Sequence, residues 1–208
     1  KINQVENYRA CATSAMREST NGQEVADEVY KRTGVRIEII DGAEEASFIA
    51  STDISSLIQK DKDYLYIDVG GGSTEFTVFS KGKVKKSRSF PIGTVRLLDN
   101  KVSDKTWEDV EKWIKKHTKD CEHIEAIGSG GNINKIHKNS NSKEGEPLSY
   151  QYLTDYHNYV SGFSYEERIR LLGFNPDRAD VILYALTVFT TAMKWSGAEL
   201  VHVPRNRL

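Results

Sequence analysis

The stretch that decides the fold is YIDVGGGSTEF, residues 66–76. An apolar strand delivers Asp68 into a turn of three glycines and two hydroxyl residues, and a second β-branched and aromatic segment follows. Glycines can take positive φ and let backbone N–H groups converge on an anion, while the hydroxyls add donors and Asp68 faces a metal ion. We therefore predict a strand–turn–strand unit and not a flexible linker. The phosphate ligands expected in it are Gly70, Gly71, Gly72, Ser73 and Thr74.

The composition is that of an ordinary globular protein. The chain has 208 residues, of which 38% are hydrophobic and 28% charged, enough for one domain or one domain plus part of another. The net charge of −1 excludes a globally basic nucleic-acid binder. No apolar run reaches membrane length and no signal-like segment opens the chain, so we expect a cytoplasmic protein without nucleic-acid or membrane partners. Cys11 and Cys121 lack metal-ligand spacing and are expected to be reduced core thiols.

Strand and helix patterns alternate along the chain. In the first half we expect a buried strand at 8–12, a helix from 21 to 34, a strand at 35–39, a helix at 43–50, and a return strand that follows a turn at 80–83 and runs to 90. In the second half we expect a helix begun by Ser103 or Asp104, a strand at 124–127, a capping box at 164–167, a helix from 177 to about 196, and a strand at 200–203.

A second glycine turn follows the strand at 124–127. It reads GSGGN over residues 128–132, and Asn132 is expected to cap a helix at 133–138. Backbone amides at such a turn are a second candidate for ligand contact. The phosphate ligands expected here are Ser129, Gly130, Gly131 and Asn132.

Four motifs in order resemble the Ppx/GppA family of exopolyphosphatases and guanosine pentaphosphate phosphatases. They are ATSAMR at 12–17, GAEEA at 42–46, DVGGGSTE at 68–75 and GSGG at 128–131. The resemblance implies the α/β fold class, with a ribonuclease-H-like lobe of the actin, sugar kinase and Hsp70 (ASKHA) superfamily and an active site between two such lobes. Residues 1–40 would be the C-terminal remnant of the first lobe, and residues 41–208 most of the second.

The resemblance also implies that parts of the family protein lie outside this sequence. The family's first phosphate motif would precede Lys1, and its closing helices would follow Leu208. We therefore expect a fragment that folds but is weak or inactive by itself. A homodimer of the full-length protein is compatible with the resemblance.

Single residues acquire roles from the resemblance. Glu45 would be the general base that activates water, although the pattern by itself favours an ordinary acid in the first turn of a helix, as it does for Glu44. Arg17 would be a second catalytic residue that grips a phosphate oxygen. Asp68 and Glu75 would hold Mg²⁺, with a solvent-facing strand residue as the alternative for Glu75.

The expected reaction is hydrolysis of the terminal phosphoanhydride of inorganic polyphosphate or of guanosine pentaphosphate, with Mg²⁺ as cofactor. The motifs do not choose between the two substrates, because both present a terminal phosphate. Ser129 and Asn132 stand where relatives often have threonine, and both keep a donor. An ASKHA-type kinase or ATPase, or a phosphate-binding fragment without activity, is the alternative. The lysine-rich stretch at 81–88 is interpreted as a solvated hairpin that protects a sheet edge.

Overall fold

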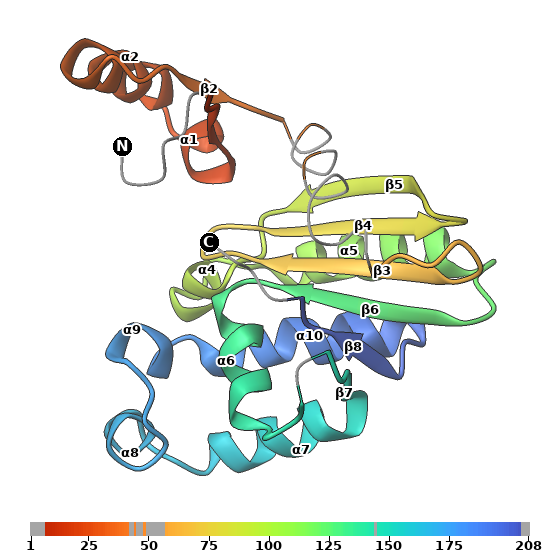
Figure 1. Cartoon of the computed structure of the whole chain (residues 1–208). Coiled ribbons are helices and arrows are strands. Elements are labelled where there is room, and N and C mark those ends of the chain that lie inside the picture. Colours follow the sequence, from red (N-terminus) through yellow and green to blue (C-terminus); the bar gives the residue numbers. More distant parts are fainter. Residues whose placement is uncertain (1–6, 42–43, 45–47, 49–56, 144, 205–208) are drawn as a thin grey trace. The chain divides into compact units, whose positions relative to one another are not determined.

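A computed structural model describes residues 7–41, 44, 48, 57–143 and 145–204 (Figure 1). The chain forms two compact units, Lys1–Phe48 and Ile49–Leu208. The assignment of residues 1–40 and 41–208 to two lobes stays a prediction. None of the described helices is both long and apolar enough to cross a membrane.

The first unit is a parallel pair of strands with connecting helices. Its elements are β1 (Ala10–Ala12), α1 (Ser14–Glu18), α2 (Gly22–Thr33) and β2 (Ile37–Ile39). α2 ends where predicted because Gly34 adopts a φ of 75°, the left-handed conformation that terminates helices. Of the predicted helix at 43–50, Glu44 and Phe48 are helical, and the other positions lie outside the described residues.

The second unit is built on a six-stranded sheet of order β5-β4-β3-β6-β8-β7 (Figure 1). The strands are β3 (Asp63–Val69), β4 (Thr74–Ser80), β5 (Lys83–Phe90), β6 (Ile124–Ser129), β7 (Leu148–Ser149) and β8 (Leu200–His202). The first three form an antiparallel meander, and β6 and β8 continue the sheet in parallel from β3. This is the strand order expected of a ribonuclease-H-like lobe, with β7 added antiparallel at the edge.

Seven helices are described in this unit. They are α4 (Thr94–Leu98), α5 (Asp104–Thr118), α6 (Gly131–Asn139), α7 (Tyr150–Ser161), α8 (Tyr165–Arg170), α9 (Pro176–Ala179) and α10 (Ile182–Ser196). α10 is the central buried helix, as predicted, and packs against α4, α5, α6, α7 and the sheet. Its Leu186, Phe189 and Met193 are fully buried, and each such side chain contributes about 1.5–3 kcal/mol by leaving water.

β3 is buried on both faces because its side chains alternate between two clusters. Leu65, Ile67 and Val69 belong to the main core with the helices. Tyr64 and Tyr66 point to the other face, where they pack with Phe79 and Ile127 in a second, smaller cluster. The same alternation places Asp68 on the second face, as the residue that follows Tyr66 in this series.

Most local predictions in this unit are confirmed. Ser103 caps α5, and the capping box of Ser164 and Glu167 is present. The single helix predicted from 177 to 196 is wrong, because the chain forms α9 and then α10. At the break the Val181 N–H bonds the carbonyl of Arg178, three residues back instead of four. The strand β7 and the helix α7 were not predicted individually.

The two cysteines differ in their exposure to solvent. Cys121 is half-buried, and burial raises the pKa of its thiol to about 11. Cys11 is exposed, so the prediction of a core thiol is wrong there. Side chains alternate along a strand, and the neighbours Ala10 and Ala12 are only half-buried while Cys11 faces solvent, so the expected buried strand is a partly exposed one.

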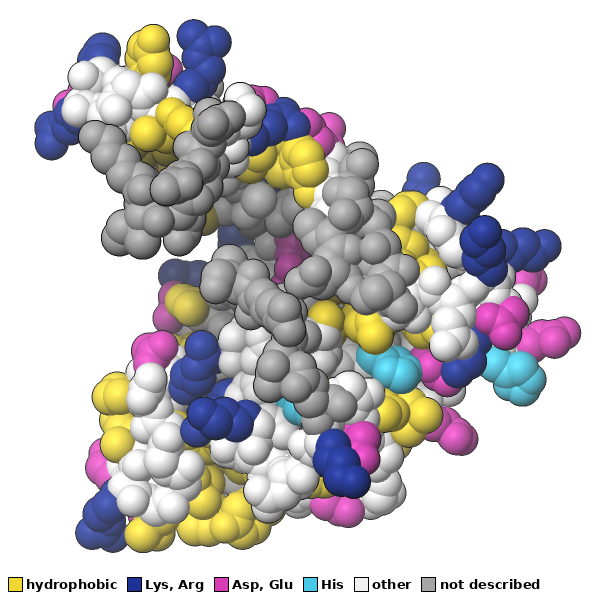
Figure 2. Space-filling model, viewed as in Figure 1, with side chains coloured by type: hydrophobic (Ala, Val, Ile, Leu, Met, Phe, Trp, Pro, Cys, Tyr) yellow, Lys and Arg dark blue, Asp and Glu magenta, His cyan; other side chains and the backbone are white. Residues whose placement is uncertain are grey.

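The lysine-rich stretch follows the edge of the sheet. β5 is the terminal strand, and residues 83–86 are all exposed. Figure 2 shows lysine and arginine side chains gathered over the end of the β4–β5 hairpin. Charged side chains on an edge strand discourage pairing with other chains, which agrees with the predicted protective hairpin.

Candidate phosphate-binding site

Four polar residues form a row across the sheet, one on each of four adjacent strands. Ser129 of β6 pairs with Asp68 of β3, Asp68 with Glu75 of β4, and Glu75 with Ser89 of β5. Residues that pair directly across a sheet carry their side chains on the same face. The polar row therefore brings both predicted metal ligands and the predicted phosphate ligand Ser129 together, beside the first glycine turn.

Glu75 is held by two serine hydroxyls. Its Oε1 accepts a hydrogen bond from Ser73 Oγ at 2.6 Å and another from Ser89 Oγ at 2.8 Å. The residue is buried, so the alternative of a solvent-facing strand residue is wrong. Buried carboxylates need such donors, and within the described part of the chain Oε2 has no hydrogen-bond partner and could contact a ligand.

The Asp68 carboxylate is less well stabilised by hydrogen bonds than that of Glu75. Burial and the neighbouring charge of Glu75 raise the pKa of Asp68 to about 6, against hydrogen bonds from Tyr66 and Ser129 that favour the ionised form. The Tyr66 hydroxyl lies 3.4 Å from Oδ2, a long contact. Ionised Asp68 is thus under-compensated in the protein by itself.

The polar row fits a magnesium ion by its donor chemistry. Two carboxylates on one face, one of them with a raised pKa, are relieved by a hard divalent cation. Among the described residues, no three or more His, Cys, Asp or Glu side chains are grouped so that they could hold a metal ion. Mg²⁺ suits such a sparse set, because it usually takes one or two carboxylates and completes its shell with water and phosphate oxygens.

The first glycine turn is anchored to the start of α4. Its three glycine carbonyls accept hydrogen bonds there, Gly70 from the N–H of Thr94 at 2.9 Å, Gly71 from the N–H of Val95 at 3.0 Å, and Gly72 from Nε of Arg96 at 2.7 Å. Within the described part of the chain, the N–H groups of Gly71, Gly72 and Ser73 have no acceptor. The turn therefore offers backbone donors to an anion.

Gly71 and Gly93 are needed for close approach and not for unusual backbone angles. The prediction of positive φ at residues 70–72 is wrong, since none of the three adopts it. A Cβ on Gly93, the residue before α4, would lie 2.2 Å from the carbonyl oxygen of Gly71, and a Cβ on Gly71 would lie 3.3 Å from Val95. The turn and α4 thus pack backbone against backbone.

The hydroxyls of the turn are engaged within the protein. Ser73 Oγ donates to Glu75, and Thr74, which is fully buried, donates its hydroxyl to the carbonyl of Ile92. The donors that the turn presents to an anion are therefore its N–H groups. The assignment of Ser73 and Thr74 as phosphate ligands stays a prediction.

The second glycine turn, residues 128–132, lies against the end of β3. Gly130 has a φ of +107°, and a Cβ there would lie 3.0 Å from the carbonyl oxygen of Val69 and 3.5 Å from Oδ1 of Asp68. α6 begins directly after it, so the prediction that Asn132 caps the helix is wrong. Asn132 is buried in the first turn of α6 and accepts a hydrogen bond from Arg178 Nη1 at 3.4 Å.

The two predicted catalytic residues, Glu45 and Arg17, belong to the N-terminal part of the sequence, residues 1–48. Glu45 lies outside the described residues. Glu44, its neighbour, pairs with Arg9 at 2.8 Å, which gives it a structural role. Arg17 lies in the first unit, where its Nη1 donates to the carbonyl of Ile40 at 2.7 Å. The catalytic roles of Glu45 and Arg17 stay predictions.

Sequence reasoning missed the residues that support the turn. Gly93 and Arg96 are twenty or more positions away from the glycines that they contact, and nothing in the local pattern links them. A glycine directly before a short helix was the available signal. Ser89 was missed because it becomes a partner of Glu75 only through strand pairing.

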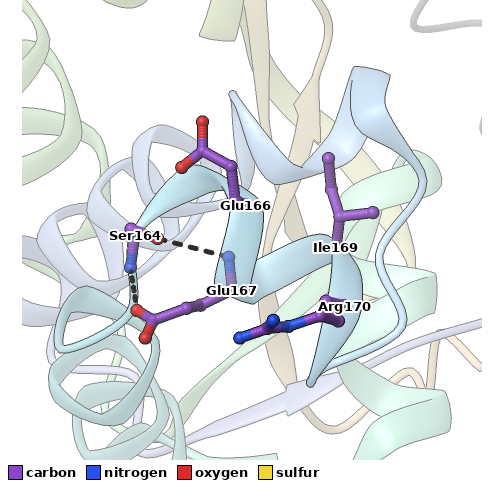
Figure 3. Close-up of a pocket in the computed structure, with 5 residues that line it drawn as sticks. All are labelled: Ser164, Glu166, Glu167, Ile169 and Arg170. Atoms are coloured by element: carbon purple, nitrogen blue, oxygen red, sulfur yellow. Dashed lines mark hydrogen bonds between the residues drawn. The ribbon is translucent and has the colours of Figure 1, made fainter.

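A surface hollow on α8 is separate from this site. It measures about 600 Å³ and includes none of the residues of the polar row or the glycine turns (Figure 3). Its lining residues are Ser164, Glu166, Glu167, Ile169 and Arg170. Ser164 and Glu167 are bonded to each other in the capping box, so these polar groups serve the start of the helix.

Known proteins are similar to this chain in both sequence and fold. A model of the Ppx/GppA phosphatase family matches residues 2–203. The bifunctional 3-dehydroquinate synthase/phosphatase of Fusobacterium nucleatum is 28% identical over 215 residues, which cover 94% of this chain and 32% of the relative. The guanosine-5'-triphosphate,3'-diphosphate pyrophosphatase of Aeromonas hydrophila is 33% identical over 99 residues, which cover 48% of this chain and 20% of the relative.

The chain thus spans a third or less of these curated relatives. The crystal structure of an exopolyphosphatase from Cytophaga hutchinsonii superposes with a TM-score of 0.78 at 22% identity, covering 98% of this chain and 72% of that one. The predicted α/β, ribonuclease-H-like fold class is therefore confirmed. With the family model matching nearly every residue and the four motifs in order, the chain belongs to the Ppx/GppA phosphatase family.

Proposed function

We propose that this chain is part of a phosphohydrolase that removes the terminal phosphate of inorganic polyphosphate or of guanosine pentaphosphate with the help of Mg²⁺. The observation that carries the proposal is the polar row beside a turn whose N–H groups at Gly71, Gly72 and Ser73 have no acceptor in the described residues. Phosphoryl transfer needs such preorganised donors around the phosphate oxygens.

Each group of residues has a task in this reaction. The N–H groups of the first turn bind the terminal phosphate, and the second turn, residues 129–132, binds the neighbouring phosphate at the start of α6. Asp68 and Glu75 would hold Mg²⁺, which supplies positive charge to the phosphate oxygens when bound. Glu45 orients the attacking water and takes its proton, and Arg17 stabilises charge on the transferring group.

The names of the relatives support both substrates. The Aeromonas protein acts on a guanosine pentaphosphate, and the Cytophaga structure is an exopolyphosphatase. Both molecules present a terminal phosphoanhydride, and the features described above recognise phosphate groups. The bond that is cleaved is therefore of the same kind in both molecules, and the experiment compares the two substrates.

The test measures phosphate release by the full-length protein from long-chain polyphosphate and from guanosine pentaphosphate, side by side, with and without Mg²⁺. We expect release from at least one substrate, dependent on Mg²⁺ and strongly reduced by Asp68→Asn. The matched control is Asp155→Asn on the exposed face of α7, which should keep full activity. Absence of release from both substrates, with the folded protein and Mg²⁺ present, would overturn the proposal.

A further inference from the structure

We propose that Arg96 is a positioning residue that orients the Gly72–Ser73 peptide, so that the turn presents N–H groups and not a carbonyl to the bound phosphate. The inference rests on the proposed function, because it concerns the same turn. Three hydrogen bonds tie the carbonyls of Gly70, Gly71 and Gly72 to α4.

Peptide geometry converts these carbonyl bonds into an orientation of the N–H groups. The described chain contains no cis peptide, and in a planar trans peptide the C=O of one residue and the N–H of the next point in opposite directions. When the carbonyls of residues 70, 71 and 72 point at α4, the N–H groups of Gly71, Gly72 and Ser73 must point away from it. These are the three N–H groups that have no acceptor within the described residues.

The third of these bonds differs in kind from the first two. Gly70 and Gly71 are held by main-chain N–H groups of Thr94 and Val95, which any residue except proline would supply. The Gly72 carbonyl is held by a side chain, Nε of Arg96, at 2.7 Å. The Gly72–Ser73 peptide is thus the one whose orientation depends on the identity of a side chain.

Glycine makes this dependence important. A peptide next to a glycine can rotate at low steric cost, because no Cβ restricts the neighbouring dihedral angles. Rotation of the Gly72–Ser73 peptide would replace an N–H donor by a carbonyl oxygen, which repels a phosphate. Arg96 is half-buried beside the turn and bonds the carbonyl with a charged donor, the stronger class of hydrogen bond.

Two conservative substitutions separate orientation from charge. Arg96→Gln places an amide nitrogen at the position of Nε but removes the charge, whereas Arg96→Lys keeps the charge and places a methylene there. If orientation is the role, the glutamine variant should resemble the wild type and the lysine variant should resemble Arg96→Ala. If charge alone is the role, the lysine variant should resemble the wild type and the glutamine variant should resemble Arg96→Ala.

The experiment records backbone amide NMR spectra of the 208-residue chain while inorganic phosphate is added. We expect the wild type and Arg96→Gln to bind phosphate with affinities within about threefold of each other, and Arg96→Lys and Arg96→Ala to bind about tenfold more weakly. Lys101→Ala, which removes an exposed charge just after α4, is the control and should bind like the wild type. Circular dichroism confirms that each variant is folded.

Spectra without phosphate give an independent reading of the turn. Arg96→Ala and Arg96→Lys should shift the amides of Gly72 and Ser73, and Arg96→Gln should leave them nearly in place. Unchanged amides in Arg96→Ala, or retained phosphate affinity in Arg96→Lys with a loss in Arg96→Gln, would overturn the inference. A wild type that binds no phosphate at the turn would instead count against the proposed function, while the spectra without phosphate still decide the role of Arg96.

Discussion

Asp68 and Glu75 face each other directly across β3 and β4, yet the protein stabilises their charges unequally. Glu75 accepts two short hydrogen bonds from serines, whereas Asp68 has a long contact with Tyr66 and a pKa raised to about 6 by burial and by the charge of Glu75. A cation bound beside the two carboxylates would supply the positive charge that Asp68 lacks.

Asp68→Asn should stabilise the metal-free chain at neutral pH. The raised pKa means that the favourable, protonated form of Asp68 is lost as the pH rises from about 4 through 6, and this destabilises the fold at higher pH. The neutral amide avoids the loss, so at pH 8 the free energy of unfolding should increase by up to about 3 kcal/mol. At pH 4 the two proteins should unfold at nearly the same denaturant concentration.

Magnesium should act against this difference in stability between the wild type and Asp68→Asn. Mg²⁺ added at pH 8 should raise the unfolding midpoint of the wild type and leave that of Asp68→Asn unchanged. Equal stabilisation of both proteins would remove Asp68 from the metal site. Urea unfolding with and without Mg²⁺, followed by circular dichroism, provides the measurement.

Glu125→Gln should destabilise the protein at neutral pH, in contrast to Asp68→Asn. Burial opposes the ionisation of Glu125, but hydrogen bonds from Lys62 and His202, both at 2.7 Å, outweigh it and lower the pKa. The stability that ionised Glu125 contributes is present above its ordinary pKa and is lost as the pH falls through the lowered value. At pH 7 the substitution should cost about 1–2 kcal/mol, and the cost should vanish in strong acid. A stabilising effect at pH 7 would contradict this assignment.

Gly93→Ala should disturb the glycine turn from the outside. The new Cβ would lie 2.2 Å from the Gly71 carbonyl oxygen, so the turn must move away from α4. We expect a loss of about 1–3 kcal/mol in stability and weaker phosphate binding. Gly162→Ala is the control, because its Cβ would meet the Tyr159 carbonyl at an ordinary 3.4 Å. Equal behaviour of the two variants in unfolding and phosphate titration would argue against the packing described.

Glu45→Gln tests the general base in the full-length protein. Loss of the base acts on the transition state, so turnover should fall about a hundredfold or more while substrate binding changes little. Glu44→Gln should retain most of the activity, since Glu44 is engaged by Arg9. The reverse pattern in the kinetics of phosphate release would move the catalytic role to Glu44.

The local sequence determined the strand pair, some of the helix ends and the family. The β-branched and aromatic residues of 64–69 and 74–80, the glycine after α2 and the Ser164 capping box act through neighbouring residues, so they can be recognised without a structure. The break between α9 and α10 escaped prediction, because no glycine or proline stands between the two helices and buried residues continue at helical spacing through Ala179, Ile182 and Leu186.

The support of the site was decided by the tertiary structure. Strand pairing joins Ser129, Asp68, Glu75 and Ser89, which are spread over more than sixty positions, and thereby places one carboxylate under hydroxyl donors and leaves the other with a raised pKa. Packing of α4 on the glycine turn sets which way the peptide groups face. The sequence determined which residues could bind phosphate, but hydrogen bonds between distant segments decide which donors they present, because peptide orientation and desolvation depend on neighbours in space.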